Sequence, residues 1–206
     1  MDVRLFNQLN IHYHTNENLA RQLLPFARKF LSMPSKLTNT WDYKNTYTDL
    51  EGLALETELD FFVDYITDQA NQYLITHNLK IKQSLKLSVS LFTSEMAEGD
   101  QHTAHNHPGA LLSGLIYLNV PNNSAPLEFY SPRSKLTSWL NYIDELCYVA
   151  SDEIFEITEN HAIVVKPKNG LFLLWESWAL HRVPKNNADE RITMVFNIGV
   201  ADADQL

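Results

Sequence analysis

The first 80 residues of the chain place apolar side chains at helical spacing. From Asn16 the segment NENLARQLLPFARKFLSM repeats them every three or four positions, and Asn is a residue type that commonly caps a helix. The segment DLEGLALETELDFFVDYITDQANQYLITHN, residues 49–78, does the same, with Glu and Asp on its other face. Its apolar series is Leu55, Leu59, Phe62, Ile66, Ala70 and Tyr73. We expect two amphipathic helices that lie against a sheet.

After about Lys80 the pattern changes to short alternating or continuous apolar runs. Gly, Pro, Asn and Ser separate these runs, as is typical of turns between strands. The runs are SLKLSVSLF, LLSGLIYLNV, PLEFY, HAIVVKP, GLFLLWE and RITMVFNIGV. Helices followed by many strands indicate an α+β or mainly β chain, in which two N-terminal helices buttress a β-sandwich or a double-stranded barrel.

Length and patterning together favour a single domain over residues 1–206, since there is no internal repeat or Pro/Gly-rich linker. Residues 1–80 form its mainly helical support and residues 81–206 its β-barrel core. Between 134 and 160 the strand pattern lapses into loosely helical spacing. We interpret 134–160 as an excursion from the barrel; a short helix, a lid, a homodimer contact and a plain surface insertion all stay open.

The composition, with 45% hydrophobic and 20% charged residues, is that of a globular protein. No apolar run approaches the roughly 18 residues of a membrane span, and MDVRLFNQLN lacks the pattern of a signal peptide, so we expect no membrane segment and a cytoplasmic protein. The single cysteine, Cys147, excludes an intrachain disulfide and fits a reducing compartment. A formal charge of −9 argues against a broad phosphate-binding surface, so a nucleic-acid partner is not expected.

Candidate chemistry is concentrated in the histidines. The six residues 102–107, directly before an apolar run, include three histidines: His102, His105 and His107. Side chains two residues apart on an extended strand share a face, so His105 and His107 can present two imidazoles to one point. His181, after the apolar run LFLLWE, is the candidate third ligand. Three imidazoles indicate a transition metal, with Fe, Zn, Cu and Ni all open. An H-x-H pair alone is weak evidence, because a polar turn can carry two exposed histidines.

A candidate anion-binding residue follows on the next strand. Arg191 begins the run RITMVFNIGV ten residues after His181, and the intervening RVPKNNADE is polar and turn-forming. A guanidinium at the start of a strand that points into the core can bind a carboxylate inside the barrel through two parallel hydrogen bonds. An ordinary salt bridge at the barrel rim is the alternative for Arg191.

Together these motifs resemble the non-haem Fe(II)- and 2-oxoglutarate-dependent dioxygenases, whose double-stranded β-helix (jelly-roll, cupin-like) core carries H-x-D/E, a distal His and an Arg. The resemblance is closest to a microbial and phage-associated group with H-x-H-P, SG-x-x-Y-L, H-x-V and R-x-x-x-x-F-N patterns. This chain reads HNHPGALLSGLIYLNVP, LEFYSPR, GLFLLWESWALHRV and RITMVFN in the same order, from about Val89 onward.

The resemblance implies that His105, His107 and His181 are the catalytic metal ligands, with His107 at the position that usually holds a carboxylate. It also implies that Arg191 binds the C5 carboxylate of 2-oxoglutarate and that Tyr117 adds a hydrogen bond, although a Tyr in an apolar strand is also an ordinary core residue. The implied cofactors are Fe(II), 2-oxoglutarate and O₂. The implied reaction is hydroxylation of a C–H bond in an amino-acid, peptidyl or small-metabolite substrate.

Two departures from the pattern keep alternatives open. The third histidine makes the ligand set neutral, and three-His sites also occur in cupin-type oxygenases that need no 2-oxoglutarate and in zinc enzymes. The segment WESW replaces the usual Pro and leaves Glu176 near the distal ligand, where it either orients an imidazole or is exposed. The alternatives are therefore a three-His metal cupin enzyme that does not use 2-oxoglutarate and a non-catalytic β-barrel that binds a ligand or a partner.

Overall fold

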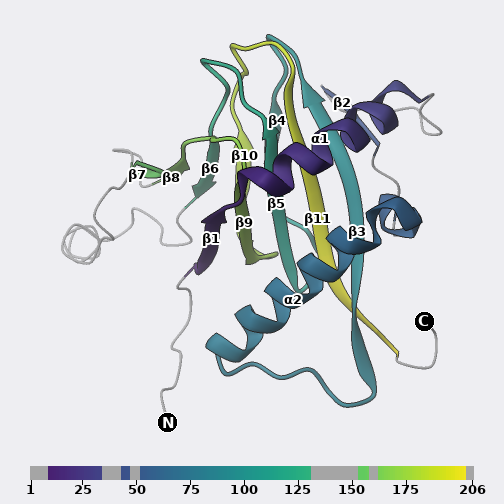
Figure 1. Cartoon of the computed structure of the whole chain (residues 1–206). Helices are drawn as coiled ribbons and strands as arrows, with labels where there is room; N and C mark the ends of the chain where they lie inside the picture. The colour runs from purple at the N-terminus through teal and green to yellow at the C-terminus, as the bar shows by residue number, and fades with distance from the viewer. Residues whose placement is uncertain (1–8, 34–42, 47–51, 131–152, 158–161, 203–206) are drawn as a thin grey trace, which may run out of the picture.

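The computed structural model describes residues 9–33, 43–46, 52–130, 153–157 and 162–202, and the structural statements below concern these residues. Within them, two α-helices lie over the outer face of a larger sheet, and a smaller sheet faces its inner side (Figure 1). Neighbouring strands of both sheets pair antiparallel. This arrangement agrees with the mainly β, jelly-roll class that the sequence predicted.

Helix α1 (Glu17–Ser32) begins where the sequence pattern placed it. The Asn16 side chain caps the helix, because its Oδ1 accepts a hydrogen bond from the Leu19 backbone N at 3.1 Å. Its apolar stripe, including Leu23 and Phe30, is buried against the larger sheet.

Helix α2 (Asp60–Thr76) begins later than predicted, because the preceding residues form two short 3₁₀ helices, η1 (Leu53–Leu55) and η2 (Thr57–Leu59). The prediction that Leu55 lies on the core face is wrong, since Leu55 is 70% exposed. A 3₁₀ helix has three residues per turn, so Leu55 falls out of line with the stripe that starts at Leu59. The remaining predicted positions, Leu59, Phe62, Ile66, Ala70 and Tyr73, are buried.

The larger sheet has six strands in the described residues. In spatial order they are β1 (Ile11–Thr15), β9 (Leu171–Glu176), β5 (Leu112–Asn119), β11 (Arg191–Asp202), β3 (Leu85–Met96) and β2 (Lys44–Asn45). The strands β3, β5, β9 and β11 confirm four predicted apolar runs. The edge strands β1 and β2 were not predicted, because they are short and contain few apolar residues.

The smaller sheet has five strands in the described residues. In spatial order they are β4 (His102–His105), β10 (His181–Val183), β6 (Leu127–Tyr130), β8 (Ala162–Val165) and β7 (Phe155–Ile157). Most of the excursion predicted at 134–160, including its candidate lid, lies outside the described residues. The part that is described, 153–157, contains β7, which pairs with β8 and is therefore strand and not helix.

Alternation along the strands divides the apolar side chains between two cores. One core fills the space between the helices and the larger sheet, and the second lies between the two sheets. Strand β11 contributes to both sides: Ile192, Met194 and Phe196 join the helix-side core, whereas Arg191, Thr193 and Val195 line a pocket between the sheets. The strand that completes the core thus also carries the candidate anion-binding residue.

The S-G and F-N motifs of the sequence meet in the larger sheet. Gly114 lies opposite Phe196, and Ser113 lies opposite Asn197. A Cβ on Gly114 would be 2.3 Å from Phe196 Cζ and 2.4 Å from the Leu173 carbonyl oxygen, so only glycine fits. Ser113 Oγ donates a hydrogen bond to Asn197 Oδ1 at 2.8 Å. These four motif residues therefore specify strand packing.

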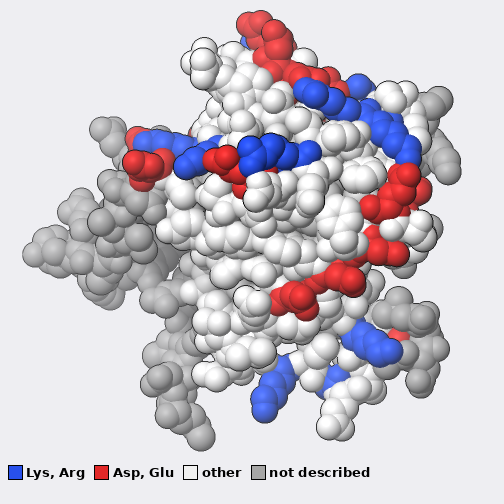
Figure 2. All heavy atoms as spheres, in the orientation of Figure 1, with Lys and Arg blue, Asp and Glu red and all other residues white. Residues whose placement is uncertain are grey.

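Charged side chains of both signs are interspersed on the face shown in Figure 2, and much of this face is uncharged. The described part of the face presents no continuous basic surface of the kind that binds nucleic acid. Among the described residues, the helices are too short or too polar to cross a membrane.

Candidate metal centre

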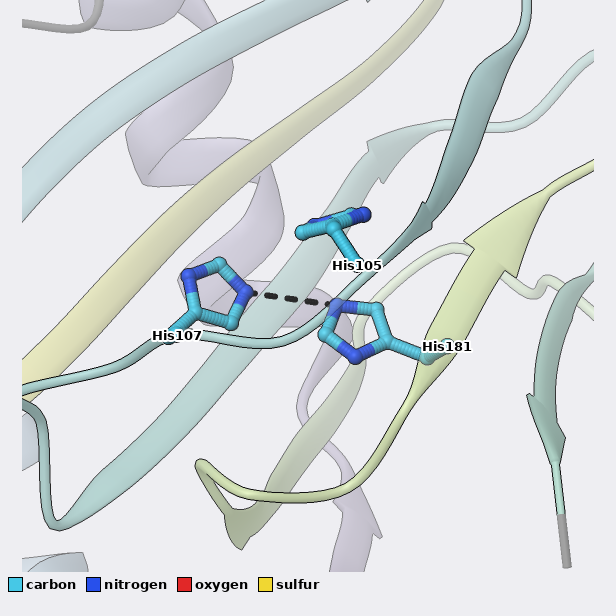
Figure 3. Close-up of side chains that lie close together, drawn as sticks. All are labelled: His105, His107 and His181. Atoms are coloured by element: carbon cyan, nitrogen blue, oxygen red, sulfur yellow. Dashed lines mark hydrogen bonds between the residues drawn. The ribbon is translucent and has the colours of Figure 1, made fainter.

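The structure brings the three predicted ligands together at one end of the smaller sheet. His105 ends β4 and His181 begins β10, and the two residues are opposite each other in the antiparallel pair. His107 lies in the loop after β4, which is held by a 3.0 Å hydrogen bond from the His107 backbone N to the Ser177 carbonyl oxygen. The three imidazoles point toward one another (Figure 3), and one ligand atom from each lies within 4.8 Å of the others.

Backbone carbonyl groups orient two of the imidazoles. His105 Nδ1 is 2.8 Å from the Thr103 carbonyl oxygen, and His181 Nδ1 is 2.8 Å from the Ala179 carbonyl oxygen. A carbonyl oxygen only accepts, so each Nδ1 carries the proton and donates it. Each Nε2 is therefore left with a lone pair, as a metal ligand requires.

The spacing of the nitrogens fits a metal ion. His107 Nε2 and His181 Nε2 are 3.3 Å apart (Figure 3). Two imidazole nitrogens at about 2.1 Å from one ion and at right angles to each other are separated by about 3 Å. His107 and His181 therefore already have the separation of neighbouring ligands, and His105 adds a third imidazole to the same point.

The same environment keeps the imidazoles neutral. Burial, with the neighbouring His105 as the next cause, lowers the pKa of His181 to about 3. Burial, with His105 as the next cause, lowers the pKa of His107 to about 4. Burial also lowers the pKa of His105 itself. A metal ion at neutral pH thus meets three unprotonated ligands and displaces no proton from them.

His102 lies beside the ligands as a fourth imidazole. Its ring stacks on that of His105 with a centroid distance of 3.8 Å, and its Nδ1 is 3.1 Å from the Tyr43 hydroxyl. Burial, followed by the charges of His105 and His181, lowers the pKa of His102 to about 3. Tyr43 was missed by the sequence analysis, because its segment carries no motif that distinguishes it from a surface tyrosine.

Arg191 and Tyr117 lie together in the interior, as 2% and 0% exposed side chains. The Arg191 Cζ is 5.0 Å from the Tyr117 ring centroid. Arg191 Nε donates to the Ala125 carbonyl oxygen at 3.1 Å, and Nη1 is 3.5 Å from Met96 Sδ. Arg191 Nη2 and the Tyr117 hydroxyl have no hydrogen-bond partner among the described residues. No described carboxylate pairs with Arg191, so the salt bridge considered for it is not formed there.

One pocket joins the histidines to the arginine. Its empty volume is about 470 Å³, part of it open to solvent, and its lining includes all three predicted ligands and Arg191. Most of the other lining side chains are apolar, among them Phe92, Met96, Leu115, Leu127 and Val195. A buried cation without an anion is unfavourable, so the pocket suits a small molecule with a carboxylate at the arginine end.

Glu176 is partly buried at the end of β9. The sequence left open whether this carboxylate orients an imidazole or is exposed. Backbone carbonyl oxygens, and not Glu176, accept the Nδ1 protons of His105 and His181. The main chain therefore orients these two rings.

Three imidazoles and a buried arginine share one pocket inside a double-stranded β-helix. This combination is typical of enzymes that hold a metal ion within the barrel. The sequence model of the family described as "Putative 2OG-Fe(II) oxygenase" matches residues 90–197, more than half of the chain, and the chain belongs to this family. It is accordingly an oxygenase whose cofactors are Fe(II), 2-oxoglutarate and O₂. The resemblance drawn from the motifs is confirmed.

Solved structures with the same fold include three enzymes. A prolyl-4-hydroxylase from Pseudomonas putida has a TM-score of 0.60 and 12% identity, over 93% of this chain and 92% of that chain. The non-haem α-ketoglutarate-dependent epimerase SnoN from nogalamycin biosynthesis has a TM-score of 0.60 and 13% identity, over 94% and 76%. HygX from Streptomyces hygroscopicus, with nickel and 2-oxoglutarate bound, has a TM-score of 0.57 and 10% identity, over 93% and 83%.

At these identities the likeness shows the fold alone, and it confirms the predicted double-stranded β-helix core. No curated protein matches the chain.

Proposed function

We propose that this oxygenase is a hydroxylase that acts on a C–H bond of an amino-acid, peptidyl or small-metabolite substrate. The observation that carries the proposal is the buried Arg191, which has no carboxylate partner among the described residues and shares a pocket with three convergent imidazoles. The similar folds of a prolyl-4-hydroxylase and of HygX, which has also been solved with hygromycin B bound, support both a peptidyl and a small-molecule substrate.

In this proposal His105, His107 and His181 hold Fe(II) through one nitrogen each. Because all three ligands are neutral, the ion keeps its full double charge. In a site with one carboxylate ligand, part of that charge is already balanced by the protein. The extra positive charge favours a dianionic cosubstrate, and His107 thereby contributes to the binding of 2-oxoglutarate as well as of iron.

Arg191 and Tyr117 bind the distal carboxylate of 2-oxoglutarate. Arg191 Nη2 and the Tyr117 hydroxyl are the donors left without partners, and burial raises the pKa of Tyr117, which keeps its hydroxyl proton in place. The guanidinium presents a planar pair of donors that matches the geometry of a carboxylate. The anion would thus neutralise a buried charge at the same time as it fills the pocket.

When bound, Fe(II) supplies the oxidation chemistry, in which O₂ and 2-oxoglutarate yield succinate, CO₂ and one oxygen atom inserted into the substrate C–H bond. The protein's part is to orient the reactants and to limit water in the pocket, through apolar walls such as Leu115, Leu127 and Val195. We also propose a cytoplasmic location, supported by the single cysteine, Cys147.

The test is an anaerobic titration of the purified apoprotein with Fe(II) and then with 2-oxoglutarate. We expect the weak visible charge-transfer band of a 2-oxoacid chelated to ferrous iron. Arg191→Met should abolish the band at moderate 2-oxoglutarate concentration and leave the iron stoichiometry unchanged. Arg182→Met is the matched control, because Arg182 is an exposed arginine on β10 whose Nε is 2.6 Å from Glu128 Oε2 on β6.

Iron binding without the band would favour the three-His cupin enzyme that does not use 2-oxoglutarate. A band of wild-type intensity in Arg191→Met would show that Arg191 does not bind the cosubstrate. Succinate formation without a hydroxylated product, in the presence of a range of amino acids and peptides, would contradict the proposed substrate classes.

A further inference from the structure

We propose that Asn186 is the positioning residue of the cosubstrate pocket, because its carboxamide fixes the two segments that hold the Arg191 guanidinium. The inference rests on the cosubstrate role proposed above for Arg191. Asn186 lies in the turn between β10 and β11 and is fully buried. The sequence marked this turn only as polar.

Two groups from distant parts of the chain restrain Arg191. The Ala125 carbonyl oxygen, in the connection between β5 and β6, accepts from Nε at 3.1 Å. The sulfur of Met96, the last residue of β3, lies 3.5 Å from Nη1. A planar guanidinium held at two of its nitrogens has a fixed orientation, and the third nitrogen, Nη2, is the one without a partner.

The Asn186 carboxamide binds the backbone of both restraining residues. Its Oδ1 accepts from the Ala125 backbone N at 2.9 Å. Its Nδ2 donates to the Met96 carbonyl oxygen at 3.0 Å. Nδ2 also lies 2.6 Å from the carbonyl oxygen of Ala188 and 3.1 Å from that of Ala97. With an N–H donor on one side and carbonyl acceptors on the other, the amide has one orientation that satisfies its neighbours.

Asn186 is itself held by its main chain. Its backbone N donates to the Asp100 carbonyl oxygen at 2.8 Å, and its own carbonyl oxygen accepts from the Gly99 backbone N at 2.8 Å. These bonds fix the residue to the turn between β3 and β4. Three segments that are far apart in sequence therefore meet at Asn186: residues 96–100, residue 125 and residues 186–191. The Arg191 side chain contacts the first two of them, at Met96 and Ala125.

Removal of the carboxamide should move the guanidinium more than the histidines. An alanine at 186 leaves the Ala125 N–H and the Met96 carbonyl buried without their partner, and both segments must shift to recover one. The imidazoles of His105 and His181 are held separately, by the carbonyl oxygens of Thr103 and Ala179. Asn186 should consequently affect the binding of 2-oxoglutarate and not that of the metal.

The experiment compares Asn186→Ala with Asn187→Ala, a matched control in which the neighbouring exposed asparagine of the same turn is truncated. The first readout is solvent exchange of the Arg191 Nε proton by ¹⁵N NMR of the metal-free protein, with the signal assigned by its loss in Arg191→Lys. The second is calorimetric titration of the Mn(II)-loaded protein with 2-oxoglutarate.

In Asn186→Ala we expect faster exchange of the Arg191 Nε proton and 2-oxoglutarate binding weaker by about tenfold, with Mn(II) affinity unchanged. Asn187→Ala should match the wild type in the exchange rate, in 2-oxoglutarate affinity and in Mn(II) affinity. An Arg191 Nε proton that exchanges as slowly in Asn186→Ala as in the wild type would overturn the proposal. If Asn186→Ala does not fold, Asn186→Ser is measured in its place, and wild-type exchange in that variant overturns the proposal equally.

Failure of the proposed function gives a different result. If the wild-type protein binds Mn(II) but not 2-oxoglutarate, Arg191 is not a cosubstrate residue. The NMR comparison still decides whether Asn186 positions the guanidinium, because it is made without metal or cosubstrate.

Discussion

The chain contains two H-x-H pairs, His12–His14 on β1 and His105–His107 at the end of β4, and only the second belongs to the cluster of three histidines that could hold a metal ion. The two pairs have the same spacing, and both precede or lie within strand structure. His12 and His14 share the face of β1 that meets α2. No third metal-ligating side chain joins them among the described residues.

The difference lies in what each nitrogen contacts. His14 Nε2 is hydrogen-bonded to the Tyr65 hydroxyl, and His12 Nε2 is 3.2 Å from Gln69 Oε1. These partners are side chains of α2, so the pair His12 and His14, the outer cluster, joins a helix to the larger sheet. In the inner cluster, His105, His107 and His181, carbonyl groups accept from Nδ1 of His105 and His181, so the lone pair of each ring lies on Nε2. The same spacing therefore has two outcomes: the Nε2 atoms of His12 and His14 contact side chains of α2, whereas those of His107 and His181 face each other beside a third imidazole.

The largest expected effect is the loss of metal binding when a histidine of the inner cluster, and not of the outer cluster, is removed. His181→Ala should weaken Fe(II) binding by more than about 100-fold and abolish formation of succinate, because one ligand and the ring that faces His107 are lost. Iron per protein after gel filtration measures the first effect. His12→Ala is the control and should keep full iron stoichiometry; the loss of iron from that variant would contradict the distinction between the clusters.

A smaller effect is expected when the inner cluster is converted to the usual two-His, one-carboxylate set. His107→Asp should retain iron, because carboxylate oxygen is a suitable ligand for it. The variant should bind 2-oxoglutarate more weakly, by about fivefold, since the site loses one unit of positive charge. Calorimetry of the metal-loaded variant measures this change. Unchanged or tighter 2-oxoglutarate binding would show that the neutral ligand set has no role in cosubstrate affinity.

The outer cluster should affect stability and not chemistry. His14→Ala removes the bond to Tyr65 and a ring stacked on Phe172 at a centroid distance of 4.9 Å. The free energy of unfolding should fall by about 1–2 kcal/mol in urea titrations, with iron stoichiometry unchanged. Tyr65→Phe, which removes the other partner of this bond, should give a similar or smaller loss. A fall in iron content in either variant would contradict the assignment.

The smallest effect is a pH dependence that both clusters share. Burial lowers the pKa of His14, with His12 as the second cause, and burial also lowers the pKa of His107 to about 4. The unfolded chain, with an ordinary histidine pKa of about 6.5, then binds more protons than the folded apoprotein, so stability falls as pH falls below about 6.5. Urea midpoints of the apoprotein between pH 7.5 and 5.5 measure the slope, which should be shallower in His107→Asn. A slope equal to that of the wild type would contradict the neutral state of His107.

The sequence predicted the parts of the site that depend on residue type. Imidazole is a ligand type that suits transition metals, so three histidines at this spacing predicted a candidate metal site. A strand that begins with Arg191 and continues with apolar residues places the guanidinium at a predictable face. Periodicity likewise identified α1 and the long strands. It misplaced Leu55, because a 3₁₀ turn and an α-helical turn cannot be distinguished over a few residues.

The parts that the sequence could not predict depend on contacts between distant segments. The role of Asn186 exists only because three segments converge on it, and a polar residue in a turn carries no sign of that. Tyr43 reaches His102 from a segment 59 positions earlier. The H-x-H pair at His12 and His14 shows the reverse case, in which a suggestive spacing is explained by contacts with helix α2.

Strand pairing in the larger sheet joins segments that are far apart in the sequence. Ile11 pairs with Trp175, about 160 residues later, and β11 pairs with β3 across about 100 residues. Such long-range pairing is slow, because distant segments must meet before any contact stabilises them. The ribosome releases His105 and His107 well before His181 and Arg191, so the nascent chain exposes an incomplete chelate with no partner strand. We therefore expect iron loading to follow the late closure of the barrel, because metal supplied during translation would meet only two of the three predicted ligands.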